Sequence, residues 1–490
     1  MSLETSRPFA LAANLVGSDV PAIEHLFVTR RVLVRLELEM ARSAPMREAF
    51  LLAVNEILRF CPNVVIAVPP NFDATARTAT ALAREIYGPD ATISTVAPNE
   101  LDASSFEAIL NVGREVCEHR AWIAIDASGW LARIATAACG IKSLPNQTAP
   151  PNIFAALAAA SLGAGQVFLS LVGRPLLSRP LEVSLWSLET STTGELTVGP
   201  PVPDGLELQA LLVGCGGVAN GFAHAAARAQ MRGRLETVDK QSLRRENFGP
   251  YVGARRSRLG KPKTEMIREM LVPMIEVTPR NERFRFFKAR IGYGETTPPE
   301  LILVGLDDER TRHDVQRLWA PITIDMAAEE LTSQLILKDL GDDGICLLGA
   351  YSVDGRTPSE LEQLAVTLGL PVERVAEFES QITAEDIAAA PPEKRQMLED
   401  AHRRDQRICG RATQLDLHEE QSSVAFTPAV PFVTAFSGIV GAAQTARHLM
   451  EQSAGSIHFQ FSFLSFQGRR LQMRCSSKCE CQERRDRVAS

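Results

Sequence analysis

The sequence predicts an α/β protein made of two halves, and three observations support this prediction. Helical segments and short apolar segments alternate through the first two hundred residues, as they do in βαβ units. A second alternating region begins near residue 206, where an apolar strand leads into a glycine-rich turn. With 490 residues, the chain is also too long for one hydrophobic core, so several domains are expected.

The composition excludes several classes of protein. Apolar residues make up 45% and charged residues 23% of the chain, which is ordinary for a globular protein. The net charge of -7 argues against a nucleic-acid binder, whose affinity depends on neutralising phosphates. No run of eighteen apolar residues and no signal-like N-terminus is found, so we expect a cytoplasmic protein without membrane spans. Its nine cysteines are then expected to serve metal binding or catalysis rather than disulfides.

Residues 1–205 form the first predicted domain. Its expected elements are helices at 46–60, 75–86 and 152–173 and buried strands at 63–70 and 121–129. None of these strands leads into a glycine fingerprint for phosphate. We therefore expect an α/β domain that binds no nucleotide.

The remaining chain divides into three predicted segments, which follow a Gly-, Pro- and Thr-rich linker at 192–205. Residues 206–351 form the first part of a second α/β domain. Residues 352–424 contain several polar helices with capping residues at their starts, which indicates a helical insertion. Residues 425–490 return to apolar packing and end in a hairpin-like segment, so they complete the second domain.

A glycine-rich turn marks a predicted nucleotide site. The strand at 206–213 leads into GCGGVA, where Gly214, Gly216 and Gly217 allow a tight turn. A helix follows, and its exposed N–H groups and dipole favour an anion. Asp239 ends the next strand about twenty residues on, where a carboxylate normally accepts a ribose hydroxyl.

The residues after the turn favour a nucleoside triphosphate with Mg²⁺. Asn247 and Lys263 follow Asp239 in the sequence, and Asp307 follows another buried strand. Because the carboxyl ends of parallel strands face one crevice, these side chains and Gly216 can converge. A lysine clamps phosphates and a carboxylate holds magnesium. The alternative is that Lys263 and Asp307 are surface charges at loop ends.

The order of these residues resembles that of the ubiquitin-activating-enzyme family, which also includes the adenylyltransferases of molybdopterin and thiamine biosynthesis. The resemblance continues with CLLG at 346–349 and PFVTAFSGIVGAAQTARHL at 431–449, and it covers 205–351 and 425–481. It implies two Rossmann-like adenylation domains, of which the N-terminal one is inactive and the C-terminal one active.

The resemblance also implies a reaction, its cofactors and its partners. Asp239 would bind the ribose of ATP, and Asn247 and Lys263 its phosphates. Asp307 would hold Mg²⁺. The C-terminal carboxylate of a ubiquitin-like protein would be adenylated, captured as a thioester and passed to a conjugating enzyme, in bacteria within an antiviral operon. The chain would act as a monomer with an internal pseudo-dimer or as a homodimer.

One departure from the family pattern concerns an Arg-Gln pair that normally follows the asparagine. Here those positions hold Pro250 and Tyr251. Nearby arginines could replace the missing guanidinium, namely Arg244, Arg245, Arg255, Arg256 and Arg258. Dimeric members also receive an arginine from the partner protomer. Arg30 and Arg31 of the N-terminal half are candidates for that role, the alternative being ordinary helix-face cations.

Cys409, inside the helical insertion, is the predicted nucleophile. In ubiquitin-type members of the family, the insertion carries the cysteine that takes the activated carboxylate. Flanking arginines would lower the pKa of this thiol and raise its thiolate fraction: Arg403, Arg404, Arg407 and Arg411. The alternative is an ordinary buried cysteine.

The C-terminal tail contains a second group of cysteines, Cys475, Cys479 and Cys481, whose spacing differs from that of zinc ribbons. In the family, two C-x2-C pairs bind structural zinc, and here the first pair is reduced to Cys346. These four thiolates would complete a tetrahedral Zn²⁺ site. The alternative is a reduced and disordered tail.

Three other functions stay open at this point. A sulfur-carrier-protein adenylyltransferase would explain the glycine turn but neither the N-terminal half nor the insertion. A nicotinamide-dependent oxidoreductase would use the turn and leave Lys263 and Asp307 idle. A catalytically dead scaffold with an adenylation fold would explain the lost Arg-Gln pair.

Overall fold

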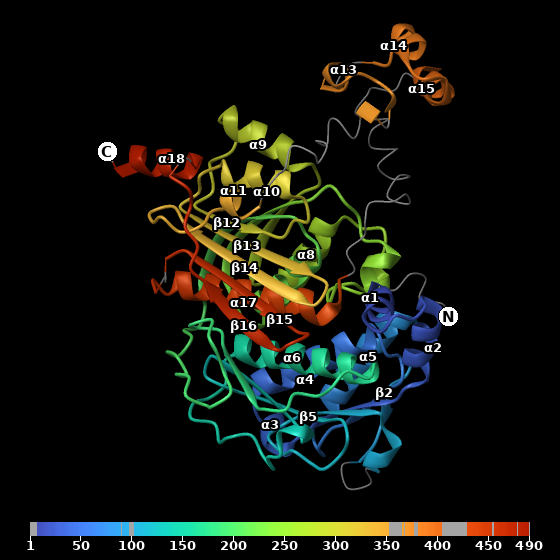
Figure 1. Ribbon diagram of the computed structural model, residues 1–490, viewed down its shortest axis with the longest axis vertical. Helices are drawn as coiled ribbons and strands as arrows, with labels where there is room; N and C mark the ends of the chain where they lie inside the picture. Colours follow the sequence, from blue (N-terminus) through green and yellow to red (C-terminus); the bar gives the residue numbers. More distant parts are fainter. Residues whose placement is uncertain are drawn as a thin grey trace. The chain divides into compact units, whose positions relative to one another are not determined.

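The computed structural model describes residues 7–89, 91–97, 102–351, 365–366, 368–376, 381–403, 429–452, 455–477 and 479–489. The chain forms two compact units, the first comprising 1–351 with 428–490 and the second 352–427. The first unit contains two mixed β-sheets of eight strands each, together with the helices that pack on them (Figure 1). The predicted α/β fold class is therefore confirmed. The finer division into an inactive domain, an active domain and a cysteine-bearing insertion stays a prediction.

The N-terminal sheet combines parallel and antiparallel strands. Its strands are β1 (Val32–Leu36), β2 (Val64–Ala67), β3 (Ser94–Thr95), β4 (Ala108–Val112), β5 (Trp122–Ser128), β6 (Leu131–Thr136), β7 (Leu181–Ser184) and β8 (Thr190–Ser191). Their order in the sheet is β3-β2-β1-β4-β5-β6-β7-β8. The first five strands in this order are parallel, and the last three are antiparallel. Strands β2, β4 and β5 are buried along their whole length, which explains why their sequences are largely apolar.

The C-terminal sheet repeats this arrangement. Its strands are β9 (Glu207–Val213), β10 (Arg232–Val238), β11 (Ile275–Arg280), β12 (Leu301–Val304), β13 (Ile322–Glu329), β14 (Thr332–Asp339), β15 (Ile457–Ser462) and β16 (Gln467–Leu471). Their order is β11-β10-β9-β12-β13-β14-β15-β16, again with five parallel strands followed by three antiparallel ones. The two halves therefore share one topology, and positions in one can be matched to positions in the other.

Helices connect the parallel strands, as crossovers of this kind require. In the N-terminal half they are α1 (Arg7–Val16), α2 (Val20–Thr29), α3 (Leu38–Ala41), α4 (Ala44–Leu58), α5 (Asp73–Tyr87) and α6 (Ile153–Leu171). In the C-terminal half they are α7 (Gly217–Arg228), α8 (Lys263–Leu271), α9 (Phe284–Gly292), α10 (Glu309–Gln316), α11 (Leu347–Ala350), α17 (Pro431–Leu449) and α18 (Glu480–Ala489). Short 3-10 turns lie at Ala103–Ser105, Ala137–Cys139, Arg245–Phe248 and Arg256–Arg258.

Four helices fill the space between the two sheets. Helices α4 and α6 cover one face of the N-terminal sheet, α7 and α17 pack on the C-terminal sheet, and α6 contacts α17 (Figure 1). The ring of Phe432 in α17 lies 5.4 Å from that of Phe168 in α6, between centroids. By length and composition α6 could cross a membrane, but 89% of its most apolar window is buried inside the protein, as in a core helix.

The second compact unit is described through three helices, α13 (Val372–Ala376), α14 (Ala384–Ala389) and α15 (Pro392–Arg403). Thr383 and Asp386 form a capping box at the start of α14. The guanidinium of Arg374 pairs with the Asp386 carboxylate at 2.8 Å. A small apolar core lies beneath these helices, built from Ala365, Leu368, Leu370, Val375, Ile382, Ala390 and Leu398.

Glycines set the close crossing of α7 and α17. A Cβ built on Gly221 would lie 2.6 Å from the carbonyl oxygen of Ala435. A Cβ on Gly438 would overlap the carbonyl oxygen of Val218 in the facing helix. The two backbones can approach this closely only because neither position carries a side chain. This crossing fixes α17 against the glycine turn at the start of α7.

We predict that Gly438→Ala lowers the free energy of unfolding by about 3 kcal/mol or more, because the helices must separate to admit the methyl group. Urea unfolding measures the change. Gly292→Ala at the end of α9 is the matched control, since its Cβ would meet nothing within 4 Å. That control should leave the free energy of unfolding unchanged or raise it by up to about 1 kcal/mol. Equal stability of the Gly438→Ala and wild-type proteins would contradict the close crossing.

Candidate functional site

The predicted phosphate turn lies between β9 and α7. Gly214 has a φ of +84°, and a Cβ there would lie 2.6 Å from the carbonyl oxygen of Gly305. Both facts require glycine at this position. Gly216 caps α7 and Gly217 is its first residue, so the exposed N–H groups of the helix begin at the turn.

Asp239 is tied to the glycine turn. Its Oδ2 accepts a hydrogen bond from the backbone N–H of Cys215 at 2.8 Å, and its Oδ1 accepts one from the N–H of Gln241 at 2.7 Å. Asp239 directly follows β10, while the turn directly follows β9. The carboxyl ends of these two neighbouring strands therefore bring the acid and the turn together, as the sequence predicted.

Lys263 is buried at the start of α8, and its side chain extends toward Gln241 and Tyr251 beside the glycine turn. It is only 5% exposed. Its Nζ donates to Oε1 of Gln241 at 2.5 Å and to the phenol oxygen of Tyr251 at 3.1 Å. A Cβ built on Gly216 would lie 3.5 Å from that same phenol oxygen. The lysine is thereby connected through Tyr251 to the glycine turn.

The negative charges of both predicted acids affect the pKa of Lys263. The pKa of Lys263 is raised, although burial by itself opposes the charged form. The opposing causes are the Tyr251 phenol and the carboxylates of Asp239 and Asp307. Because the shift is upward from a pKa that is already high, Lys263 carries its positive charge at neutral pH.

Two adjacent acids, Asp307 and Asp308, follow β12, and their side chains have different contacts. Asp308 caps α10, since its Oδ2 accepts from the backbone N–H of Thr311 at 2.6 Å. Asp307 is exposed and makes no hydrogen bond or ion pair within the described part of the chain. Its charge acts on Lys263 and on the buried Arg312, which pairs with Asp325 at 3.0 Å. Asp307 is thus the acid that can accept a cation.

The loop from 247 to 254 holds two residues of the site. The side-chain oxygen of Asn247 accepts from the N–H of Arg244 at 2.9 Å, which leaves its amide NH₂ group for a ligand. Tyr251, at one position of the missing Arg-Gln pair, bonds Lys263 as described above. From the sequence, Tyr251 indicated only that the family's Arg-Gln pair is missing. The structure shows instead a hydroxyl beside the buried ammonium.

The arginines downstream of Asn247 are engaged away from the glycine turn. Arg255 is half-buried and donates to the carbonyl oxygens of Val252 and Ala254 at 2.7 and 2.9 Å. Arg256 donates to the carbonyl oxygen of Ile86 in α5, and Arg258 pairs with Glu269 of α8 at 2.8 Å. Arg255 therefore supports the loop itself, whereas Arg256 and Arg258 bind neighbouring helices.

Arg30 and Arg31 lie at the amino end of β1. Arg30 approaches Glu107 at 3.8 Å, and the guanidinium of Arg31 lies 5.1 Å from the ring centroid of Phe106. Helix α1 is one of the parts of the N-terminal half that meet the loop, because a Cβ on Gly249 would lie 2.9 Å from Cδ of Pro8 and 3.8 Å from the backbone nitrogen of Arg7.

The matching edge of the N-terminal sheet is built differently. Strand β1 matches β9 in the order of the sheet, and Glu37 is the first residue after β1 as Gly214 is the first residue after β9. The Glu37 carboxylate accepts from the Asn111 amide at 2.6 Å and from the Glu115 N–H at 3.0 Å. It also overlaps the space that a Cβ on Gly113 would need. A carboxylate in this place repels phosphate.

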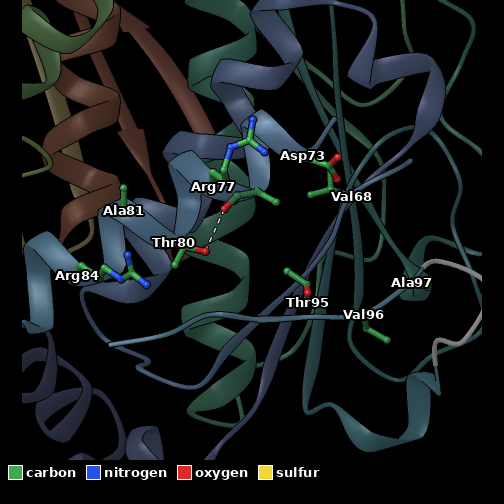
Figure 2. Close-up of a pocket in the computed structure, with 10 residues that line it drawn as sticks. Val68, Asp73, Arg77, Thr80, Ala81, Arg84, Thr95, Val96 and Ala97 are labelled. Carbon is green, nitrogen blue, oxygen red and sulfur yellow. Dashed lines mark hydrogen bonds between the residues drawn. The ribbon is translucent and has the colours of Figure 1, made fainter. Parts of the chain in front are cut away.

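A pocket of about 570 Å³ lies beyond the carboxyl ends of β2 and β3, beside α5 (Figure 2). Its lining residues are Val68, Asp73, Ala76, Arg77, Thr80, Ala81, Arg84, Thr95, Val96 and Ala97. None of them is a predicted site residue. Strand β2 matches β10 in the order of the sheet, and the three residues after β2 are Val68, Pro69 and Pro70, so no acid follows β2 in the way that Asp239 follows β10.

Cys346 lies beside the three cysteines of the C-terminal tail, although about 130 residues separate it from them in the sequence. The sulfur atoms of Cys346, Cys475, Cys479 and Cys481 all lie within 4.8 Å of one another. The Sγ of Cys479 is 3.5 Å from that of Cys346 and 3.3 Å from that of Cys481. A tetrahedral zinc site with Zn–S bonds of about 2.3 Å needs sulfurs about 3.8 Å apart. The four thiols therefore fit such an ion in number and spacing.

The predicted nucleophile Cys409 lies outside the described residues, as do Arg404, Arg407 and Arg411. Arg403 is the last residue of α15 and pairs with Asp400 within that helix. The role of Cys409 therefore stays a prediction.

Comparisons with known proteins were made at three levels. No protein-family model matches the chain, and no curated protein matches it. Among solved structures, Escherichia coli MccB with MccA is 15% identical, has a TM-score of 0.37, and covers 56% of this chain and 67% of its own. The same protein with ATP gives 14%, 0.36, 56% and 66%, and PaaA gives 12%, 0.33, 55% and 66%. Because these scores are low, we base the function on the residues of this chain.

Proposed function

We propose that this chain uses ATP to adenylate the C-terminal carboxylate of a partner polypeptide, releasing pyrophosphate. The supporting observation is the buried Lys263 ammonium beside the glycine turn. Lysine has three N–H donors, and the described contacts of Lys263 use two of them, on Gln241 and Tyr251. One donor is left for a phosphate oxygen. A hydride-transfer site would have no use for this buried positive charge.

The proposed reaction requires positioning more than bond chemistry. A carboxylate oxygen of the partner attacks the α-phosphorus of ATP, and the bond from that phosphorus to the bridging oxygen breaks. Its electron pair leaves with pyrophosphate, so no proton has to move. Asp239 would bind the ribose, while Lys263 and Asn247 would bind phosphate oxygens. Mg²⁺, held by Asp307, would neutralise charge on the departing phosphates.

Residues of the N-terminal half complete the proposed site. Tyr251 would donate a hydrogen bond where the family has the glutamine of the Arg-Gln pair, and Pro250 stands in place of the arginine, so a second cation is needed near the phosphates. Since Arg30 and Arg31 contact Glu107 and Phe106 instead, we propose Arg7 for this role. Helix α1 begins at Arg7 and packs on Gly249, two residues from both Asn247 and Tyr251.

The finer proposal is that the partner is a ubiquitin-like protein and that a thioester follows adenylation. The Cys409 thiolate would attack the acyl carbon of the adenylate and release AMP, and a conjugating enzyme would accept the acyl group next. This part rests on the family resemblance and on the separate compact unit of 352–427, whose residue range includes position 409. For the cysteine cluster we propose a structural Zn²⁺ ion, since four thiolates leave no open position for a substrate.

We predict that Lys263→Ala lowers ATP–pyrophosphate exchange by about 100-fold or more, because one preorganised phosphate donor is lost. The assay uses labelled pyrophosphate and a ubiquitin-like protein ending in glycine. Lys261→Ala is the matched control, because Lys261 pairs with Glu269 on the surface two residues away. Exchange by the Lys263→Ala protein at the wild-type rate would contradict the proposal. Failure of the wild-type protein to exchange with any tail would favour a scaffold.

We predict that Cys409→Ala abolishes a thiol-reducible adduct with the ubiquitin-like protein while pyrophosphate exchange continues. Adenylation precedes the thioester, so it does not need this thiol. Electrophoresis with and without reductant detects the adduct. Cys117→Ala, at a half-buried cysteine of the N-terminal half, serves as the control and should retain it. An adduct that survives Cys409→Ala would assign the nucleophile to another residue.

We predict that purified protein contains about one equivalent of zinc and that Cys475→Ser releases it, since three thiolates no longer close the tetrahedral site. Elemental analysis measures the metal. Cys139→Ser, far from the cluster in sequence, should retain the ion. A zinc content well below half an equivalent in freshly purified wild-type protein would remove this proposal.

A further inference from the structure

The loop from 247 to 254, which carries Asn247 and Tyr251, is held in place from several sides. Within the C-terminal half, the Asn220 side chain accepts from the N–H of Gly253 at 3.1 Å and donates back to the glycine turn. The hydroxyl of Thr434 in α17 donates to the carbonyl oxygen of Pro250 at 2.6 Å. These bonds connect the loop to the helices on either side of the phosphate turn.

The N-terminal half supplies further polar support through two buried side chains. Arg59 donates to the carbonyl oxygens of Phe248 at 2.5 Å, Ala254 at 3.0 Å and Val252 at 3.2 Å. The Asn55 amide donates to the same Val252 oxygen at 2.9 Å. Asn55 also accepts two N–H groups of Arg59, at 2.9 and 3.1 Å, and so fixes the plane of the guanidinium.

The burial of Arg59 gives these bonds their significance. A guanidinium buried without partners is strongly destabilising. Here burial and the like charge of Arg255 lower the pKa of Arg59, and its hydrogen bonds end on Asn55 and on three carbonyl groups of one loop. A well-packed apolar side chain would serve simple packing between the halves without that penalty. The arrangement is specific for one conformation of the loop.

We infer that the N-terminal half is a positioning element of the adenylation site and that Arg59, oriented by Asn55, sets the placement of the loop that carries Tyr251. This inference rests on the proposed function. Neither side chain reaches the glycine turn itself, so both act through the loop. A displacement of about 1 Å at a reacting group can lower a rate by about 100-fold. A half without a nucleotide site of its own would therefore control the other half.

The test compares Arg59→Lys, Asn55→Ala and Arg59→Ala with a matched control. Arg47→Lys is the control, because Arg47 lies on the same helix and also donates to a backbone carbonyl, that of Ala41, but within the N-terminal half. Three quantities are measured for each protein: hydrogen exchange of the amides from 247 to 254, the thermal midpoint, and the kcat and KM for ATP in pyrophosphate exchange.

The inference predicts faster amide exchange in the loop of Arg59→Lys and Asn55→Ala, with thermal midpoints close to that of the wild type. Pyrophosphate exchange should fall by about 10- to 100-fold in kcat/KM for ATP. Added guanidinium at millimolar concentration should restore part of the activity of Arg59→Ala, because it can occupy the vacated site. The Arg47→Lys protein should match the wild type in all three measurements.

Unchanged loop protection in Arg59→Lys would overturn the inference, as would normal pyrophosphate exchange with a loosened loop. The proposed function fails separately. If the wild-type protein itself gives no exchange, adenylation is refuted, whereas faster amide exchange in the Arg59→Lys loop still supports the structural role of Arg59.

Discussion

The placement of one charge, the buried ammonium of Lys263, constrains the rest of the site. A cation that is 5% exposed needs compensation for its lost hydration. It obtains this from two neutral oxygens, on Gln241 and Tyr251, and from the charges of Asp239 and Asp307. Gln241 follows β10, Tyr251 lies in the loop beyond it, and Lys263 begins α8. These three segments must therefore meet at the Lys263 Nζ atom, and they do so beside the glycine turn that follows β9.

The glycine turn, Asp239 and Lys263 could be predicted from the sequence because each follows a local pattern at a strand or helix end, and one rule about parallel sheets brings such ends together. Tyr251 could not be predicted as a site residue, because the sequence shows only that the family's Arg-Gln pair is missing. Its role follows from its hydrogen bond with Lys263, which only the structure shows. Arg59 and Asn55 carry no sequence signal at all, since their partners lie about two hundred residues away. The meeting of Cys346 with the tail cysteines was expected only from the resemblance, and Cys409 stays a prediction.

The shared topology of the two sheets makes their chemical difference easy to locate. Directly after β9 the C-terminal half has Gly214, whose φ and close contact admit no side chain, and directly after β1 the N-terminal half has Glu37. Asp239 directly follows β10, whereas Val68, Pro69 and Pro70 follow the matching strand β2. These differences lie at the ends of two neighbouring strands in each sheet. The helices α4 and α6 are retained, because the core between the sheets and the contacts of Arg59 depend on them.

The loss of the Arg-Gln pair has a further consequence for the proposed chemistry. Pro250 supplies no guanidinium, and the Tyr251 phenol can donate a hydrogen bond to a phosphate oxygen but brings no positive charge. The two carboxylates near Lys263 add negative charge to the same region. A triphosphate bound there would depend more strongly on Mg²⁺, on the N-terminus of α7 and on accurate hydrogen-bond geometry than it would with an arginine. Neutral donors lose strength steeply when their geometry is disturbed. A site that replaces charge with geometry has more need of a rigid loop, and this accounts for a guanidinium that is buried in the N-terminal half and binds three carbonyl groups of that loop.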